Sequence, residues 1–157
     1  GRYLIREKPL MPHIRPEMLQ AYGIPRSQIN NIKMGADWTT EEGDVIPNAR
    51  LIVPAEAPRS YAYCSDTRYI PTLHELLKGV DTLYHESTYG EDKLKSAEKY
   101  CHSTARQAAM VAKEAGVGQL LLGHYSSRYD DENVLLQEAK AVFENVRLTN
   151  EMDVIDV

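Results

Sequence analysis

The chain has 157 residues, of which 43% are hydrophobic, which suits one domain of ordinary size with a real core. Its formal net charge of −5 argues against a broad polyanion-binding surface, so a nucleic-acid partner would have to be held by a local patch or by metal. Two cysteines, Cys64 and Cys101, are too few for a disulfide framework, which favours a reduced, cytoplasmic setting, and no apolar run approaches the length of a membrane span.

The first 60 residues are predicted to form one strand and then an irregular, arm-like region. The chain starts at Gly1 without methionine and runs directly into an apolar segment at 3–5, so we expect it to be a fragment of a longer protein. Prolines recur between residues 8 and 60 and leave room only for short elements. The expected elements are helices at 16–22 and 27–34, a turn at 39–44 and a strand near 50–53.

Residues 61–157 are predicted to form an α/β layer, because apolar strand-like runs alternate with helical patterns. The expected strands are YAYCS at 61–65, DTLYHE at 81–86, QLLLGH at 119–124 and MDVIDV at 152–157. The expected helices cover 72–78, 96–100, 103–115 and 131–143. Thr104 and Gln107 form a plausible capping box at the start of the third helix.

Polar side chains follow three consecutive strands of this region. Asp66 follows the first strand, His85 and Glu86 end the second, and His124 follows the third. His102 adds another polar group just ahead of a helix. Ligands of α/β proteins gather at the carboxyl ends of the strands, so these side chains are the material of a metal-assisted hydrolytic site.

Each of these residues also has a simpler interpretation. Asp66 fits a turn, His85 and Glu86 fit a solvated strand end, His102 fits a neighbour of a helix cap, and His124 fits an exposed loop. Their repetition at successive strand ends is what favours a site. Three further residues are given no role: His74 as a surface residue, His13 as part of the proline-rich region, and Cys101 as a small buried thiol.

Four motifs in order carry a resemblance to a known family. They are SDTR at 65–68, HEST at 85–88, CHSTARQAA at 101–109 and LLLGHYSSRY at 120–129. This order resembles ribonuclease Z, the tRNA 3′-processing endonuclease of the metallo-β-lactamase superfamily. Ser65 and Ser87 stand where the family has glycine and alanine. The match is strong over 61–129 and looser over 5–35, and the motif set as a whole is specific.

The resemblance implies a fold and a reaction. The fold is half of a metallo-β-lactamase αββα sandwich: one mixed sheet with flanking helices from the C-terminal half, at 61–157, plus a proline-rich arm segment within 1–60. The reaction is hydrolysis of precursor tRNA after the discriminator nucleotide, which leaves a 3′-hydroxyl on the tRNA and a 5′-phosphate on the trailer.

The resemblance also implies roles for particular residues. Asp66 matches the aspartate that bridges two zinc ions, and His124 matches a terminal zinc ligand, although manganese could serve in place of zinc. His102 resembles the histidine that protonates the leaving 3′ oxygen, and Glu86 resembles the acid that orients it. Two further residues are candidates for holding phosphate: Arg128 and, more weakly, Arg68.

One motif of the superfamily is absent. None of the histidines is separated from another by a single residue, so the chain lacks His-x-His-x-Asp-His. Asp66 and His124 alone are too few ligands for a catalytic zinc, which normally takes three from the protein. We therefore expect the chain by itself to bind zinc weakly and not to cleave RNA, and we expect the N-terminal half of the same protein to be its partner.

The segment from Arg15 to Gly35 resembles the part of the family that holds an arm for the tRNA elbow. Arg26 and Lys33 are the basic residues within it after Ile24-Pro25, and the family's Gly-Pro pair is absent. A helix-turn-helix connection packed on the core is an equally good interpretation of this segment. A protein that contacts phosphates would bind its RNA with a salt-dependent affinity.

Two rival functions stay open at this point. One is a metallo-β-lactamase-fold phosphodiesterase that acts on small phosphodiesters, and the other is a non-catalytic half-domain that binds RNA or a partner. Because this chain would supply only one sheet of the sandwich and its helices, we expect it to expose an apolar sheet face that the other half should cover. Homodimerisation is therefore expected, as is typical of the family, and no membrane partner is expected.

Overall fold

The computed structural model describes residues 1–157 and divides them into two compact units. The larger unit combines Gly1–Glu7 with Arg59–Val157, and the smaller unit is Lys8–Pro58. The first strand therefore lies with the larger unit and not with the arm-like region, because it pairs with the strand that follows residue 59.

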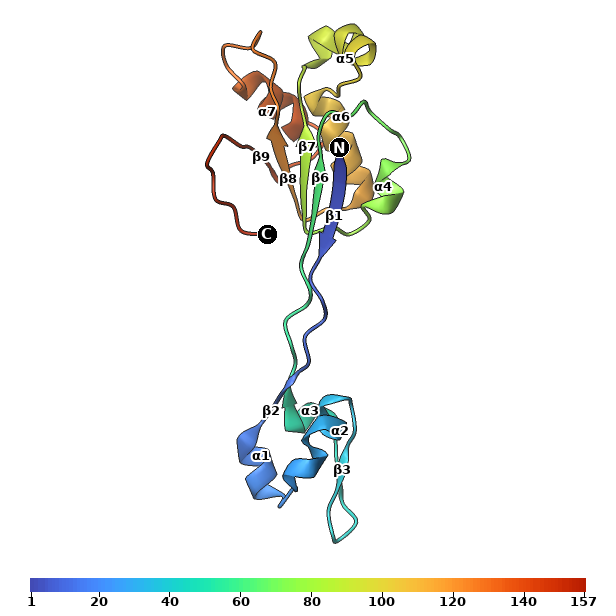
Figure 1. Cartoon of the computed structure of the whole chain (residues 1–157), viewed down its shortest axis with the longest axis vertical. Helices are drawn as coiled ribbons and strands as arrows, with labels where there is room; N and C mark the ends of the chain where they lie inside the picture. Colours follow the sequence, from blue (N-terminus) through green and yellow to red (C-terminus); the bar gives the residue numbers. More distant parts are fainter. The chain divides into compact units, whose positions relative to one another are not determined.

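The larger unit is built on a mixed five-stranded sheet (Figure 1). In spatial order its strands are β1 (Arg2–Arg6), β6 (Ser60–Cys64), β7 (Thr82–Glu86), β8 (Gln119–Gly123) and β9 (Val146–Leu148). β1 is antiparallel to β6, and the remaining neighbours are parallel. Because β6, β7 and β8 run in the same direction in register, their carboxyl ends meet at one edge of the sheet.

Helices cover one face of this sheet. They are α4 (Leu73–Leu76), α6 (Ala105–Ala115) and α7 (Asn133–Lys140). The short 3-10 turn η2 (Glu91–Lys93) and α5 (Leu94–Tyr100) follow β7 and lie beyond its carboxyl end (Figure 1). Alternate strand residues, such as Leu120 and Leu122 of β8, point into a core shared with α4, α6 and α7. No helix of the structure is both long enough and apolar enough to cross a membrane.

The central helix α6 shows why its sequence forms a helix there. Its buried side is almost entirely alanine, which lets the helix lie close to the strands. Thr104 and Gln107 form the predicted capping box, in which each side chain accepts from the other residue's backbone N–H. The helix ends at Gly116, whose φ of 64° is a left-handed conformation that favours glycine.

The opposite face of the sheet carries tyrosines. Tyr63 and Tyr84, on neighbouring strands, stack with ring centroids 4.8 Å apart, and Tyr3 lies 6.3 Å from Tyr63. The segment after β9 lies against part of this face, where Ile155 and Val157 line a hollow of about 320 Å³ together with Tyr84 and other residues.

The strand predicted at 152–157 is wrong. The place beside β8 is taken by β9, whose Val146 and Leu148 pair with Leu120 and Leu122. A turn then reverses the chain, because the backbone N–H of Asn150 donates to the Asp153 carboxylate. Ile155 and Val157 of this segment line the hollow beside Tyr61 and Tyr84, whereas Met152 and Val154 are exposed, and none of them joins the hydrogen-bonded ladder.

The smaller unit has a core of its own, so the prediction of an irregular region is wrong in this respect. Its elements are β2 (His13–Ile14), α1 (Pro16–Ala21), η1 (Arg26–Gln28), α2 (Ile29–Lys33), β3 (Trp38–Thr39), β4 (Val45–Ile46), α3 (Asn48–Leu51) and β5 (Ile52–Val53). Ile24, Ile32, Ile46 and Leu51 are buried together, and Trp38 packs against them. The prolines limit the length of each element, and this apolar set still gathers them into one cluster.

The two cysteines lie in opposite environments. Cys64 is buried at the end of β6, and burial raises the pKa of its thiol to about 11. Cys101 was predicted to be a buried thiol, and this is wrong, because it is exposed. It caps α5 with a left-handed φ of 59°, beyond the buried side of that helix.

We predict that a thiol reagent at about pH 8 modifies Cys101 quickly and Cys64 only on unfolding. The thiolate is the reactive form, and a raised pKa together with burial keeps it scarce at Cys64. Counting modified thiols against time, with and without urea, measures this. Cys101→Ser serves as the control and should remove the fast phase; rapid modification of the folded Cys101→Ser variant would contradict the assignment.

Candidate active site

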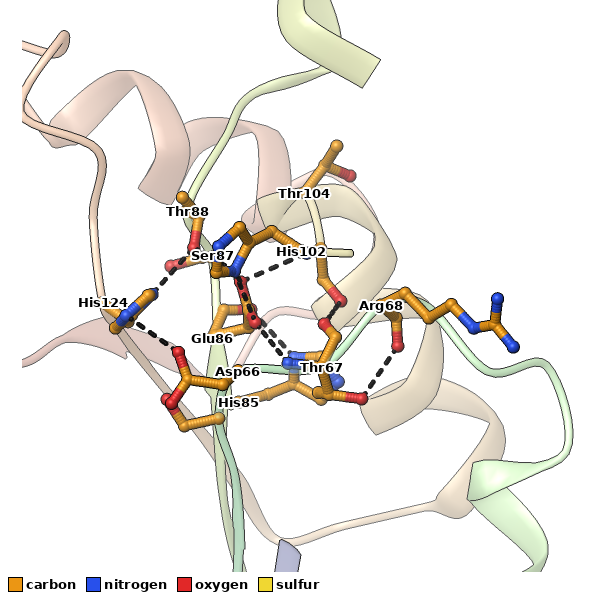
Figure 2. A network of polar contacts seen from close by, with 12 residues as sticks. Asp66, Thr67, Arg68, His85, Glu86, Ser87, Thr88, His102, Thr104 and His124 are labelled. Atoms are coloured by element: carbon orange, nitrogen blue, oxygen red, sulfur yellow. Dashed lines mark hydrogen bonds and ion pairs between the residues drawn. The ribbon is translucent and has the colours of Figure 1, made fainter. Parts of the chain in front are cut away.

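The polar residues predicted at the strand ends do come together (Figure 2). Asp66 follows β6, Glu86 ends β7, His124 follows β8, and His102 reaches the same place from the turn before α6. The rings of His102 and His124 lie 5.3 Å apart, and Asp66 Oδ1 lies 3.3 Å from His124 Nε2. The parallel register of the three strands creates this meeting point.

Unusual backbone conformations turn these side chains toward one another. Asp66 and His124 have φ values of 49° and 59°, and Cys101, just before His102, also has a φ of 59°. Non-glycine residues adopt the left-handed region rarely, and such residues concentrate at functional sites. Gly123 has a different constraint, since a Cβ there would collide with the ring of Tyr84.

Glu86 lies at the centre of the network and is fully buried. Its carboxylate accepts hydrogen bonds from the backbone N–H groups of Thr67 (2.6 Å) and Ser103 (3.2 Å) and from the Thr88 hydroxyl (2.5 Å). His102 Nδ1 lies 3.0 Å from its Oε2. Four donors from three separate segments thus satisfy one buried charge. The interpretation of Glu86 as a solvated strand end is wrong.

Three residues that surround Glu86 are not predicted from the sequence. Thr67, Thr88 and Ser103 were read only as parts of motifs, yet all three are buried and bond to Glu86. Ser103 also donates from its hydroxyl to the Thr67 carbonyl at 2.7 Å, which ties the loop after β6 to the turn before α6. Their hydroxyls and their place inside the motifs were the only signal that could have revealed them.

His102 is positioned so that one ring nitrogen faces Glu86 and the other is free. Its side chain is 22% exposed, and Nδ1 lies within hydrogen-bond distance of both Glu86 oxygens, at 3.0 and 3.1 Å. The Tyr89 ring meets the imidazole edge-on with a centroid distance of 6.2 Å. A histidine held in this way by a buried acid can donate or bind through Nε2.

The donor atoms of three residues fit a divalent metal. One ligand atom each from Asp66, His102 and His124 lies within 4.8 Å of the others. Carboxylate oxygen and imidazole nitrogen suit zinc and manganese. Asp66 and His124 are the predicted ligands, whereas His102, predicted as a proton donor, lies within the same group. The side chains of Asp66 and His124 are 69% and 41% exposed, which leaves the group accessible.

His85 is the one histidine of this region that lies in the core. Its Nδ1 lies 2.8 Å from the Glu86 carbonyl oxygen, and its buried Nε2 has no hydrogen-bond partner. The interpretation of His85 as a solvated strand end is therefore also wrong. Its position on β7, between Cys64 and Leu122 of the neighbouring strands, places it on the helix-covered side. Burial lowers the pKa of its imidazole.

The four basic candidates for phosphate binding fall into two groups. Arg68 and Arg128 lie in the larger unit, in the loops that carry Asp66 and His124, and both are exposed. The Arg68 guanidinium points away from the polar network (Figure 2). Arg26 and Lys33 lie in the smaller unit, where Arg26 is exposed and Lys33 is half-buried.

The fold and the strand-end cluster point to a class of protein, and comparison with solved structures agrees. The metallo-β-lactamase fold protein YhfI from Bacillus subtilis has a TM-score of 0.54 and 28% sequence identity to this chain. The match covers 58% of this chain and 37% of the YhfI chain. Human tRNase Z, short form, has a TM-score of 0.51 and 25% sequence identity to this chain. The match covers 67% of this chain and 36% of the human chain. The larger unit therefore has part of the metallo-β-lactamase fold, as predicted.

Curated relatives are more similar in sequence to the chain than these solved structures are. Ribonuclease Z of Bacteroides fragilis (strain YCH46) is 50% identical over 149 residues, which are 95% of this chain and 49% of the relative. Ribonuclease Z of Porphyromonas gingivalis (strain W83) is 43% identical over a match that covers 99% of this chain and 51% of the relative. The resemblance to ribonuclease Z is thereby confirmed, and the chain spans about half the length of these relatives. No protein-family model matches the chain.

We predict that Glu86→Gln lowers the free energy of unfolding by about 1–3 kcal/mol. The amide has one acceptor oxygen, so its NH₂ end must face at least one of the donors that the carboxylate satisfies. Urea denaturation measures the change. Glu98→Gln, on the exposed surface of α5, is the matched control and should shift stability by less than about 0.5 kcal/mol. Equal effects of the two substitutions would contradict the role given to Glu86.

We also predict that His85 makes stability depend on pH on the acid side. Its imidazole is held neutral in the folded chain and protonates near pH 6.5 in the unfolded chain, so the unfolded state binds more protons below that pH. The free energy of unfolding is therefore unaffected by His85 above about pH 6.5. Below that pH, protonation of His85 in the unfolded chain lowers it by up to about 1.4 kcal/mol per pH unit. Denaturation at about pH 7.5 and 5.5, compared with His85→Phe, tests this; an unchanged pH dependence in the variant would refute it.

Proposed function

We propose that this chain is part of a metal-dependent endoribonuclease that removes 3′ trailers from precursor tRNA. The observation that carries the proposal is the group of Asp66, His102 and His124 at the strand ends, with buried Glu86 behind His102. Such a group suits hydrolysis of a phosphodiester. The relatives named ribonuclease Z and the likeness to human tRNase Z support precursor tRNA as the substrate.

Asp66 and His124 are proposed as metal ligands within this chain, with zinc as the ion and manganese as an alternative. A bound divalent metal would supply Lewis-acid stabilisation of charge on the phosphate and activation of water. Two ions per complete site are proposed, with the further ligands supplied by the part of the protein that the relatives have and this chain does not include. The chain alone is accordingly proposed to bind zinc weakly and to be inactive.

His102 is proposed as the proton donor to the departing 3′ oxygen. Its Nδ1 faces the Glu86 carboxylate, which orients the ring. Its Nε2 is then the atom that holds and delivers the proton on the exposed side. His102 is thus a catalytic residue in this proposal, and Glu86 is a positioning residue that acts through it.

Binding of the RNA is assigned to both units. Arg128 and Arg68 are proposed to contact phosphate near the cleavage site, because a guanidinium can bond two phosphate oxygens at once. Arg26 and Lys33 are proposed to contact the tRNA from the smaller unit, which would serve as the arm. The negative net charge favours such local contacts over a broad basic surface.

The proposed partners are precursor tRNA, the remaining half of the protein and a second copy, in the cytoplasm. The tyrosine-bearing sheet face supports a further layer, since Tyr3 and Ile5 are 66% and 60% exposed. Large exposed apolar side chains on one sheet face are typical of a surface that another element covers.

The test is cleavage of a 3′-extended tRNA precursor by a full-length protein that contains this chain, in the presence of zinc. We expect cuts after the discriminator nucleotide by the full-length protein and none by the chain alone. A zinc-loaded full-length protein that hydrolyses only a small chromogenic phosphodiester, and leaves the precursor intact, would refute the proposal in favour of a small-molecule phosphodiesterase.

Substitutions separate the proton donor from the metal ligands. In the full-length protein, His102→Ala should lower kcat by about 10²–10⁴ while the bound metal stays unchanged. Asp66→Ala should lower both activity and metal content. Metal analysis by mass spectrometry beside single-turnover kinetics measures the difference. If His102→Ala lost metal as Asp66→Ala does, His102 would be a ligand.

A further inference from the structure

Thr88 occupies a position that the proposed roles of the other residues do not use. It is 6% exposed and lies two residues beyond β7, beside His124, which follows β8. Pairing of Glu86 with Gly123 sets the two strand ends in register, and the Ser126 backbone N–H donates to the Thr88 carbonyl at 3.0 Å. These backbone contacts hold Thr88 beside the loop that carries His124.

The Thr88 hydroxyl contacts both Glu86 and His124 (Figure 2). Its oxygen lies 2.5 Å from Glu86 Oε2 and 2.9 Å from His124 Nδ1. His102 Nδ1 is farther from it, at 3.5 Å, and faces the Glu86 oxygens at shorter distance. Thr88 is thus the direct link between the buried carboxylate and the proposed metal ligand.

The direction of each hydrogen bond follows from the number of protons. A hydroxyl has one hydrogen to donate and lone pairs that accept, whereas a carboxylate only accepts. The single Thr88 hydrogen must therefore point to Glu86, and the short distance fits a bond to a charged oxygen. The remaining contact can be satisfied only if His124 Nδ1 carries a hydrogen and donates it to Thr88.

We propose that Thr88 is a positioning residue that holds His124 in its Nδ1–H tautomer. The lone pair of Nε2 then faces Asp66 Oδ1, 3.3 Å away, and is ready to bind a divalent metal. The adjacent carboxylate would otherwise favour a hydrogen on Nε2, which would block that atom as a ligand. Thr88 opposes this preference by giving Nδ1 a better-placed acceptor. The inference rests on the proposed function only in taking His124 as a metal ligand.

The tautomer can be measured without RNA and without metal. Nitrogen-15 chemical shifts of the His124 ring, recorded on the 157-residue chain at about pH 9 where the ordinary imidazole is neutral, distinguish a protonated nitrogen from an unprotonated one. We expect a hydrogen on Nδ1 in the wild type. A hydrogen on Nε2 would overturn the proposal, whatever the chain does to tRNA.

Variants isolate the hydroxyl. Thr88→Val has a similar shape and should shift the hydrogen to Nε2, whereas Thr88→Ser keeps the hydroxyl and should retain it on Nδ1. Ser87→Ala is the matched control. Ser87 is the preceding residue and is buried, and its hydroxyl donates a hydrogen bond only to the Gly123 carbonyl, at 3.2 Å. An unchanged tautomer in folded Thr88→Val would overturn the proposal; if that variant does not fold, the wild-type and Thr88→Ser spectra decide.

Metal affinity gives a second readout. Titration of the chain with zinc should show weaker binding in Thr88→Val by about 10–100-fold, the usual effect of removing a residue that orients a metal ligand. Thr88→Ser and Ser87→Ala should stay close to the wild type. Equal zinc affinities in Thr88→Val and Ser87→Ala would overturn the proposed effect on the ligand.

Discussion

The buried carboxylate of Glu86 is the constraint on which the site depends. A charge removed from water is costly unless donors surround it, and here the donors come from the loop after β6, the end of β7 and the turn before α6. Satisfying Glu86 therefore requires these three segments to meet. Their meeting brings Asp66 and His102 together, and the parallel pairing of β7 with β8 places His124 beside them.

This arrangement lets one acid contact two histidines for which different roles are proposed. His102 faces Glu86 directly, while His124 is linked to it through Thr88. In the proposed roles, His102 needs a hydrogen on Nε2 and His124 needs a lone pair on Nε2, yet both rings are oriented through Nδ1. Hydrogen bonds in such a chain polarise one another, so the acid and metal functions are expected to be coupled.

Prediction from the sequence succeeded where local pattern decides structure and failed where packing decides it. The capping box of Thr104 and Gln107 and the strand ends at Asp66 and His124 follow from neighbours in the chain. The expected strand at 152–157 had a suitable apolar content, but β9 is the strand that pairs with β8. The burial of Glu86 and His85 was likewise invisible, because it arises from β6, β8 and α6 closing around β7.

The sequence by itself determined the order of the motifs, the α/β character and the residue types that meet at the strand ends. These are properties of local patterns and of parallel strands, whose carboxyl ends share one edge. Only the tertiary structure decided that Thr88 contacts both Glu86 and His124, that Cys101 is exposed, and that residues 8–58 gather around their own apolar cluster. Such contacts join residues far apart in the chain, and their distances and hydrogen-bond directions exist only once the segments are packed.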